Sequence, residues 1–257
     1  GEVYEVEHDL LGTRRALKVL AKQFVTRQDL TERLRVEARA LAKLSHPNLV
    51  EVYDLGTASD GRVFFAMELL SGATLRQLLN IRGQLSAQLA VRLMGQALDG
   101  LHAAHCAGLL HRDIKPENVF VCRNGTVKLL DFGVAKAIDA SANDVQLTGA
   151  GMTVGTPRYM APEQAEGRQV DARADIYAAG LVLWELLVGR PAFNDTDLQS
   201  LATAKMIDGI PSLSNAASGS VSSRLCDAVE LACDKEPVLR FPTAQAFAAE
   251  IRASLMS

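Results

Sequence analysis

Hydrophobic and polar residues alternate in several short stretches of the first 70 residues, with the two-residue period of β-strands. These stretches are residues 3–6, 16–20, 50–53 and 63–67. Between residues 31 and 44 the apolar positions instead follow the spacing of a helix with one apolar face. A Ser-Asp-Gly turn signal at residues 59–61 separates the last two strand-like stretches. The first part of the chain therefore predicts a small sheet with one helix.

After about residue 72 the pattern becomes mainly helical. Ser86 is a suitable N-cap for a long helix that runs toward Ala107, and Gly108 is a C-terminal stop signal. A second helix, after Arg173, is apolar on nearly all sides, which predicts a buried central helix. We expect a strand-rich N-terminal lobe of residues 1–70 and a helical C-terminal lobe of residues 71–257. A cleft between two such lobes is a natural ligand site.

The composition narrows the class of protein. The 257 residues are 48% hydrophobic and 22% charged with a net charge of −3, which is ordinary for a globular protein and gives no electrostatic case for nucleic-acid binding. The four cysteines form no C-x-x-C pair, which favours reduced cysteines and a cytoplasmic location. No apolar run reaches about 18 residues, so we expect no membrane contact within this chain. Because the first residue is Gly, we expect a piece of a longer protein, whose other segments could tether it to a membrane.

A predicted hairpin supplies the first hint of chemistry. Two hydrophobic runs flank an Asn-Gly pair at residues 124–125, the strongest short-range hairpin signal. If this pair forms the turn, Asn118 and Asp131 face each other with Cβ atoms roughly 4.5–5.5 Å apart. An amide oxygen and a carboxylate at that separation suit a hard cation such as Mg²⁺, although both could simply cap loop ends. Asp113 and Lys115 crowd the preceding loop, and polar groups beside apolar strands favour a functional site.

The N-terminal lobe contains a second pair of charged residues. Glu37 falls on the apolar face of the predicted helix, where an unpaired carboxylate is costly. Lys18 shares its strand face with Ala16 and Leu20. A Lys18–Glu37 ion pair would satisfy both charges. Two solvated surface charges are the alternative, and spacing alone does not decide between them.

Six short motifs occur in an order and at spacings that resemble the protein kinase family over essentially the whole chain. They are Gly1-x-Val3, Ala16-Leu17-Lys18, Glu37, His111-Arg112-Asp113 with Lys115 and Asn118, Asp131-Phe132-Gly133, and Ala161-Pro162-Glu163. One such motif is weak evidence, whereas six in order are specific. The resemblance implies an α+β, bilobal protein-kinase fold, with a small antiparallel β-sheet lobe that contains one helix and a larger, mainly helical lobe. The sequence around residues 102–105 and 160–164 further resembles bacterial members of the family.

The resemblance also implies an activity, the transfer of the γ-phosphoryl group of ATP to Ser/Thr hydroxyls of protein substrates. Asp113 would accept or orient the substrate hydroxyl, and Lys115 would neutralise charge on the γ-phosphoryl group. Lys18 would contact the α- and β-phosphates and be held in place by Glu37. Lys115 together with Thr156 resembles the serine/threonine branch of the family rather than the tyrosine kinases.

The nucleotide site implied by the resemblance spans both lobes. Asn118 and Asp131 would hold Mg²⁺, with Mn²⁺ as an alternative. Met67 would lie at the back of the adenine pocket, with residues 68–70 forming the hinge whose backbone reads the base. The nucleotide-binding residues implied in this way are Gly1, Val3, Ala16, Lys18, Met67, Glu68, Leu70, Asn118, Phe120 and Asp131.

Further positions are implied to have structural roles. Glu163 would pair with Arg240 inside the C-terminal lobe. Asp175 would anchor the catalytic loop from the start of the central helix. A hydrophobic column linking the lobes would consist of Leu41, Val52, His111 and Phe132.

The segment between Asp131 and Glu163 is rich in small and polar residues in its middle, which predicts mobility. We expect phosphorylation of Thr153, or of Thr148 as a second candidate, to order this segment through pairing with Arg112. The alternative is that both are ordinary loop threonines. The hydroxyl of Thr156 is expected near the catalytic aspartate and lysine, and dimerisation for autophosphorylation is a further expectation.

Two other interpretations stay open. Of the family's glycine-rich loop only Gly1 and Val3 are present, so a pseudokinase that binds without transferring phosphate is one alternative. The full set of polar site residues argues against it. A small-molecule kinase of the aminoglycoside-phosphotransferase type is the other alternative. The long segment before residues 161–163 argues for a protein-substrate platform instead.

Overall fold

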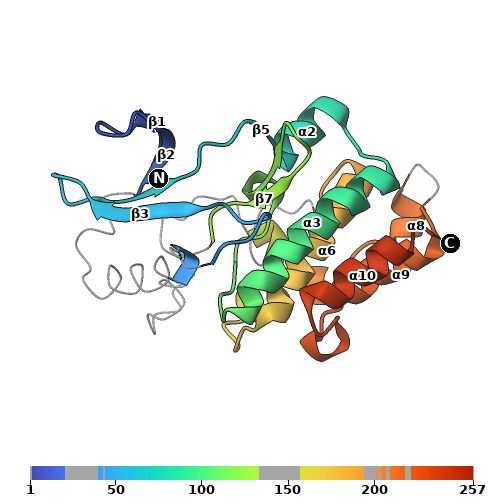
Figure 1. The fold of residues 1–257 in the computed structure, drawn as a ribbon. Coiled ribbons are helices and arrows are strands. Elements are labelled where there is room, and N and C mark those ends of the chain that lie inside the picture. The colour runs from blue at the N-terminus through green and yellow to red at the C-terminus, as the bar shows by residue number, and fades with distance from the viewer. Residues whose placement is uncertain are drawn as a thin grey trace.

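The computed structural model describes residues 2–20, 40–42, 44–132, 157–193, 201, 204–206, 209–217 and 221–256. Strands of the N-terminal part lie on one side of the molecule, and a group of packed helices forms the other side (Figure 1). The helix expected over residues 31–44 falls mostly outside the described residues, although residues 40–42 are helical. Gly1 and Glu37, two of the predicted site residues, also lie outside them.

The N-terminal sheet is antiparallel with strand order β1-β2-β4-β3. Its strands are β1 (Glu2–Glu7), β2 (Arg14–Val19), β3 (Val52–Thr57) and β4 (Val63–Met67). β3 begins two residues later than the predicted stretch 50–53, because the N–H of Val50 donates to the carbonyl of Leu129 at 3.0 Å and so joins the other lobe. The predicted turn is confirmed by Gly61, whose positive φ of 83° suits glycine.

The second sheet and the helices make up the rest of the described chain. The sheet has the order β5-β6-β7, from β5 (Gly72–Thr74), β6 (Val119–Cys122) and β7 (Val127–Leu129). The helices are α2 (Leu75–Arg82), α3 (Ala87–Cys106), α5 (Pro162–Ala165), α6 (Ala172–Val188), α8 (Leu213–Ala216), α9 (Ser223–Ala232) and α10 (Ala244–Ala253), with short 3-10 helices η2 (Pro116–Asn118), η3 (Pro157–Tyr159) and η4 (Pro237–Leu239). The predicted boundary at residue 70 therefore lies between the last strand of one sheet and the first strand of the other.

Helix α6 is the centre of the hydrophobic core, as its sequence predicts. Residues 174–187 are all buried, and α3 and α9 pack against the helix (Figure 1). Asp171 caps its N-terminus, and Gly189 ends it in the left-handed conformation. The predicted limits of α3 are also confirmed, because the Ser86 hydroxyl accepts the N–H of Leu89 and the chain leaves the helix at Gly108.

The hairpin of β6 and β7 has a different turn from the predicted one. Its loop contains three residues, 123–125, and the register pairs Val119 with Leu129. Gly125 adopts a φ of 84°, the left-handed conformation that a three-residue hairpin loop requires. The prediction that Asn118 faces Asp131 was therefore wrong by one residue, and the carbonyl of Asn118 accepts the N–H of Leu130 at 2.8 Å.

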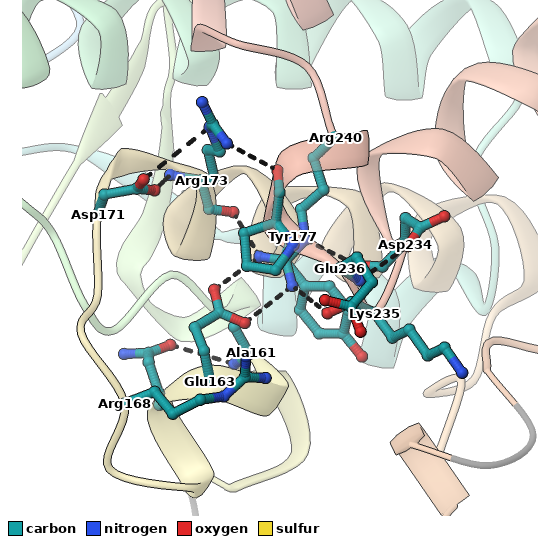
Figure 2. Close-up of polar contacts among 12 residues, drawn as sticks. Ala161, Glu163, Arg168, Asp171, Arg173, Tyr177, Asp234, Lys235, Glu236 and Arg240 are labelled. Atoms are coloured by element: carbon teal, nitrogen blue, oxygen red, sulfur yellow. Dashed lines mark hydrogen bonds and ion pairs between the residues drawn. The ribbon is translucent and has the colours of Figure 1, made fainter.

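The predicted pair Glu163–Arg240 is confirmed and lies fully inside the helical lobe. The guanidinium of Arg240 donates to the two carboxylate oxygens of Glu163 at 2.7 and 2.8 Å (Figure 2). It also donates to the carbonyls of Asp234 and Arg173, and it lies 4.8 Å from the ring centre of Tyr177. Because these bonds satisfy both buried charges, the pair ties α5 and α6 to the chain before α10.

Among the described residues, no helix is both long enough and apolar enough to cross a membrane.

Candidate active site

Asp175, in the first turn of α6, holds the loop that precedes β6. Its two carboxylate oxygens accept the backbone N–H groups of Arg112 at 2.7 Å and His111 at 2.8 Å. The Nε2 atom of His105 lies 2.8 Å from the same carboxylate. Burial acts to raise the pKa of Asp175, but the hydrogen bonds and charges of the two histidines outweigh it and lower the pKa. The predicted anchoring role of Asp175 is confirmed.

The anchored loop has an unusual backbone at Arg112. Its φ of 60° lies in the left-handed region, which a residue with a side chain rarely adopts. Two successive N–H groups directed at one buried carboxylate hold this conformation in place. The strained backbone at Arg112 therefore fixes the position of Asp113, the next residue.

Two predicted site residues, Lys115 and Asn118, converge on a third, Asp113. The ammonium of Lys115 lies 2.8 Å from Oδ2 of Asp113. The amide nitrogen of Asn118 donates to the same oxygen at 3.0 Å and to the Asp113 carbonyl at 2.8 Å. The Asp113 side chain is mostly buried but keeps 12% of its surface exposed. A carboxylate held by a lysine and an amide donor is suited to accept a proton from, or orient, a hydroxyl that approaches from solvent.

The two predicted metal ligands, Asn118 and Asp131, both carry side-chain oxygens, the ligand type that Mg²⁺ prefers, and their binding of a metal stays a prediction. The amide nitrogen of Asn118 is directed at Asp113, so its amide oxygen is the atom that a cation would take. Asp131 adds a carboxylate two residues after the end of β7, at a φ of 50°. In the described part of the chain no cluster of three or more acidic, His or Cys side chains could hold a metal. Two protein oxygens suit Mg²⁺, which usually keeps waters and substrate phosphates as its other ligands.

Lys18 connects the N-terminal sheet to this site. It lies on β2, and its ammonium contacts Oδ1 of Asp131 at 2.5 Å. The Lys18 side chain is 23% exposed and that of Asp131 39%, so the pair is open to solvent. The predicted pairing of Lys18 with Glu37 stays a prediction, because Glu37 lies outside the described residues.

His111 links the anchored loop to Phe132. The two ring centres are 4.6 Å apart, which confirms this part of the predicted column. Burial lowers the pKa of His111, and its Nε2 lies 2.7 Å from the carbonyl of Leu130, so the neutral ring donates there. Leu41 and Val52, the other predicted members, are partly buried against the same core.

The residues predicted to line the adenine pocket lie on β1, β2 and β4 of the first sheet and on β6 of the second. Ala16 is buried and pairs in register with Met67, whereas Val3 is exposed on β1 opposite Lys18. Phe120 lies on β6 opposite Lys128. These positions are described by the structure, but their contact with a nucleotide stays a prediction. Leu70, in the predicted hinge, is partly buried.

The hinge carries a contact that the sequence patterns did not predict. Oε1 of Glu68 accepts a hydrogen bond from the ammonium of Lys128 at 2.5 Å and another from the backbone N–H of Glu51 at 2.8 Å. Lys128 also donates to the carbonyl of Leu49 at 3.1 Å. The alternation of residues in β7 indicates only that Lys128 faces away from the core. The spacing of residues along the sequence therefore could not predict that Lys128 binds Glu68.

A depression in the surface lies beside Asp113. Its lining residues are Arg112, Asp113, Ile114, Tyr159, Met160, Gln164, Asp175 and Ala178. Arg112, which is predicted to bind a phosphate group, and Asp113, the predicted catalytic residue, therefore line the same depression. The threonines predicted to be regulatory, at positions 148, 153 and 156, lie outside the described residues, and their roles stay predictions.

This chain is similar in sequence and in structure to known protein kinases. The protein kinase domain family matches residues 1–250. The kinase Pkn1 of Myxococcus xanthus is 40% identical over 99% of this chain, and pkn3 of the same organism 38% over 98%; both are described as serine/threonine-protein kinases. The chain spans 36% and 47% of the length of these two relatives. The PknI kinase domain of Mycobacterium tuberculosis has a TM-score of 0.78 and 29% identity, covering 99% of this chain and 91% of that one.

Proposed function

Because this chain belongs to the protein kinase family, on the bacterial serine/threonine kinase side, we propose that it transfers the γ-phosphoryl group of ATP to Ser or Thr hydroxyls of protein substrates. The observation that supports this most is the convergence of Lys115 and Asn118 on Asp113. Lys18 contacts Asp131, and we propose that oxygens of Asp131 and Asn118 bind the cation. The bilobal kinase fold expected from the sequence is confirmed by the family match and the solved neighbours.

In the proposed reaction each polar residue has one task. Asp113 orients the acceptor hydroxyl and takes its proton, and Lys115 neutralises charge on the transferred group. Lys18 binds phosphate oxygens and is released from Asp131 as it does so, with Glu37 as its proposed partner. Bound ATP supplies the phosphoryl group, and Mg²⁺ or Mn²⁺ neutralises its charge. Phosphoryl transfer depends mainly on such positioning, which the anchor at Asp175 provides.

The choice of a protein acceptor rests on the segment before α6. The Glu163–Arg240 pair fixes residues 161–163 against the helical lobe, which gives a firm base for a substrate platform beside the depression at Asp113. Lys115, and Thr156 by its sequence context, favour Ser/Thr over Tyr acceptors. We further propose regulation through phosphorylation of Thr153, with Thr148 as second candidate, and pairing of the phosphate with Arg112. We also propose that the protein forms dimers. We propose a cytoplasmic location, in which segments outside this chain can tether the domain to a membrane.

The decisive test is phosphate transfer from labelled ATP with Mg²⁺ to the protein itself and to a generic Ser/Thr substrate. Wild type is compared with Asp113→Asn, and each is made at this length and with the upstream residues that complete the glycine-rich loop. Losing a positioned base typically costs about 10²–10⁴-fold in rate. Label on Ser/Thr that disappears with Asp113→Asn supports the proposal. ATP binding without transfer at either length would contradict it and favour a pseudokinase.

A further inference from the structure

Lys205 is a buried lysine of the helical lobe that contacts the backbone beside the candidate active site. It belongs to the helical residues 204–206 and is 3% exposed. Its Nζ atom donates a hydrogen bond to the carbonyl oxygen of Met160 at 2.6 Å. Met160 lies between η3 and α5, and it lines the depression that also contains Asp113. Lys205 has no task in the proposed transfer, yet it holds the chain at one wall of the site.

Two aromatic rings lie beside the ammonium of Lys205. Its Nζ atom is 5.8 Å from the ring centre of Tyr177 in α6 and 5.4 Å from that of Phe193. Both aromatic side chains are buried. The face of an aromatic ring attracts a cation, and the attraction is larger where water is excluded. The two rings and the Met160 carbonyl therefore favour the charged form of the amine at this place.

Several elements contribute charged or titratable groups around Lys205. Burial raises the pKa of Tyr177 in α6 and that of Cys233 after α9, so both side chains stay neutral. The guanidinium of Arg240 lies 4.8 Å from the Tyr177 ring centre and is paired with Glu163 of α5 (Figure 2). Within this group, the Arg240 and Glu163 charges offset each other, and Lys205 is the residue that titrates near neutral pH.

The charge of Lys205 is unfavourable for the stability of the lobe. Burial lowers the pKa of Lys205 to about 7 from 10.5. At and below that pH the folded protein holds a buried ammonium, whereas a methionine would fill a similar volume with no charge to desolvate. What the lysine adds is a charge-assisted hydrogen bond, which is stronger than a neutral one. The amine therefore serves its partner, the backbone at Met160, and not the packing of the core.

The chain around Met160 is held at two points. Arg240 binds Glu163 in α5, and Lys205 binds the carbonyl three residues earlier. Met160 and its neighbour Tyr159 both line the depression beside the candidate active site. Small displacements of a surface that positions a substrate reduce the fraction of productive complexes. The bond from Lys205 therefore acts on the place where an acceptor chain would bind.

We propose that Lys205 is a positioning residue for the acceptor substrate, which holds the backbone at Met160 and thereby one wall of the depression beside Asp113. This inference rests on the proposed kinase function, because an acceptor hydroxyl has to reach Asp113 through that depression. Lys205 is buried and does not reach the substrate itself, so its loss affects acceptor binding more than the transfer step. The bond weakens as the pH rises through neutrality, because the neutral amine is only an ordinary donor.

The first test compares the steady-state kinetics of wild type, Lys205→Met and the control Trp184→Phe with one serine peptide. The control removes a different buried bond to a backbone carbonyl, from Nε1 of Trp184 to Pro211 at 3.0 Å. At pH 6 we expect the peptide KM of Lys205→Met to be about tenfold above that of wild type, as for loss of a charge-assisted hydrogen bond. The ATP KM and kcat should stay within about twofold, and the control should match wild type.

The pH profile tests whether the charge of Lys205 carries the effect. At pH 8.5, where its amine is neutral, the peptide KM of wild type should lie within about threefold of that of Lys205→Met. Taking the ratio of the two KM values cancels the titration of groups that both proteins share. The methionine variant is expected to fold, because it has no buried charge to desolvate. A ratio that stays constant between the two pH values, or a loss confined to kcat, overturns the inference.

Hydrogen exchange of backbone amides tests the positioning without any transfer of phosphate. Mass spectrometry follows residues 158–161 and α3 in wild type and Lys205→Met at pH 6, without ATP or peptide. We expect exchange to be about tenfold faster in Lys205→Met at residues 158–161 and unchanged in α3. Equal exchange in both proteins overturns the inference, and so does uniformly faster exchange, which indicates a purely structural role. If wild type transfers no phosphate, the kinase proposal fails, whereas this measurement still decides whether Lys205 holds Met160.

Discussion

The two ion pairs Glu163–Arg240 and Lys18–Asp131 show how differently one protein uses opposite charges. The side chains of Arg240 and Glu163 are 0% and 3% exposed, and the guanidinium makes further bonds to backbone carbonyls. Lys18 and Asp131 are 23% and 39% exposed and meet through one close contact between two lobes. All three guanidinium nitrogens of Arg240 have acceptors within the folded protein. Lys18 and Asp131, in contrast, are exposed enough to bind other groups.

The difference follows from the cost of taking charges out of water. A buried pair must satisfy all its hydrogen bonds to offset desolvation, so it becomes a fixed part of the fold. A half-exposed pair gains little from its attraction, because water screens it, and it can be exchanged at low cost. We therefore expect the buried pair to stabilise the lobe, and the open pair to be replaced when Lys18 and Asp131 bind phosphate and metal.

The largest expected effect is that of Arg240→Ala. Removing the cation leaves Glu163 buried with an uncompensated charge, which typically costs about 3–5 kcal/mol of unfolding free energy. Urea unfolding followed by circular dichroism measures it. The double variant Glu163→Gln with Arg240→Met should recover much of the loss, because neither charge remains. A loss below 1 kcal/mol for Arg240→Ala would remove the basis of the comparison.

Asp175→Asn is expected to have the next largest effect. Charge-assisted hydrogen bonds contribute about 1.5–3 kcal/mol each at most, and Asp175 accepts two from the catalytic loop. Its folded pKa lies below the ordinary 3.8, so its contribution is present above that pH and is lost as the pH falls further. Unfolding free energies between pH 3 and pH 6 should show a shallower acid decline in Asp175→Asn than in wild type. Parallel declines would contradict this role.

Lys205 extends the comparison to a buried lysine of the helical lobe. It is 3% exposed, and its ammonium donates to the carbonyl of Met160 at 2.6 Å. Burial lowers the pKa of Lys205 to about 7 from 10.5. Between these two values the unfolded chain binds the extra proton, so stability should rise with pH, by about 1–2 kcal/mol from pH 7 to pH 9. Lys205→Met should lack this rise, whereas the exposed control Lys235→Met should keep it.

The smallest expected effect on stability is that of Lys18→Met. An exchangeable, partly exposed pair contributes about 0–1 kcal/mol, so the urea midpoint should barely move. Phosphate transfer, in contrast, should be lost, because Lys18 has a proposed task in binding phosphate. A large loss of stability would show that the Lys18–Asp131 pair is structural. Retained transfer would contradict the proposed role of Lys18.

Local patterns predicted much of the helical lobe. Ser86 and Gly108 mark the ends of α3, and the apolar run after Arg173 identified the buried helix α6. The turn of the hairpin was predicted one residue too short. The Asn-Gly signal favours both two-residue and three-residue loops, and the left-handed Gly125 closes the longer one.

The contacts that complete the candidate site were harder to predict. Arg76 and Glu185 are 109 residues apart, and the only local signal was an arginine in the first turn of a helix. The partner of Lys18 was expected to be Glu37, but the described contact is with Asp131. Periodicity indicates which face of an element a residue occupies, and several carboxylates can compete for one such cation.

The sequence by itself determined the family, most strands of the N-terminal sheet, the long helices α3 and α6, and which polar residues are proposed for phosphoryl transfer. These depend on short motifs and on periodicity, which are local properties of the chain. Only the tertiary structure decided which charges pair, how Asp175 fixes the backbone before Asp113, and that Arg76 pairs with both Glu117 and Glu185. Such pairings depend on the distance between residues remote in sequence and on their burial, which sets the cost of leaving a charge unpaired.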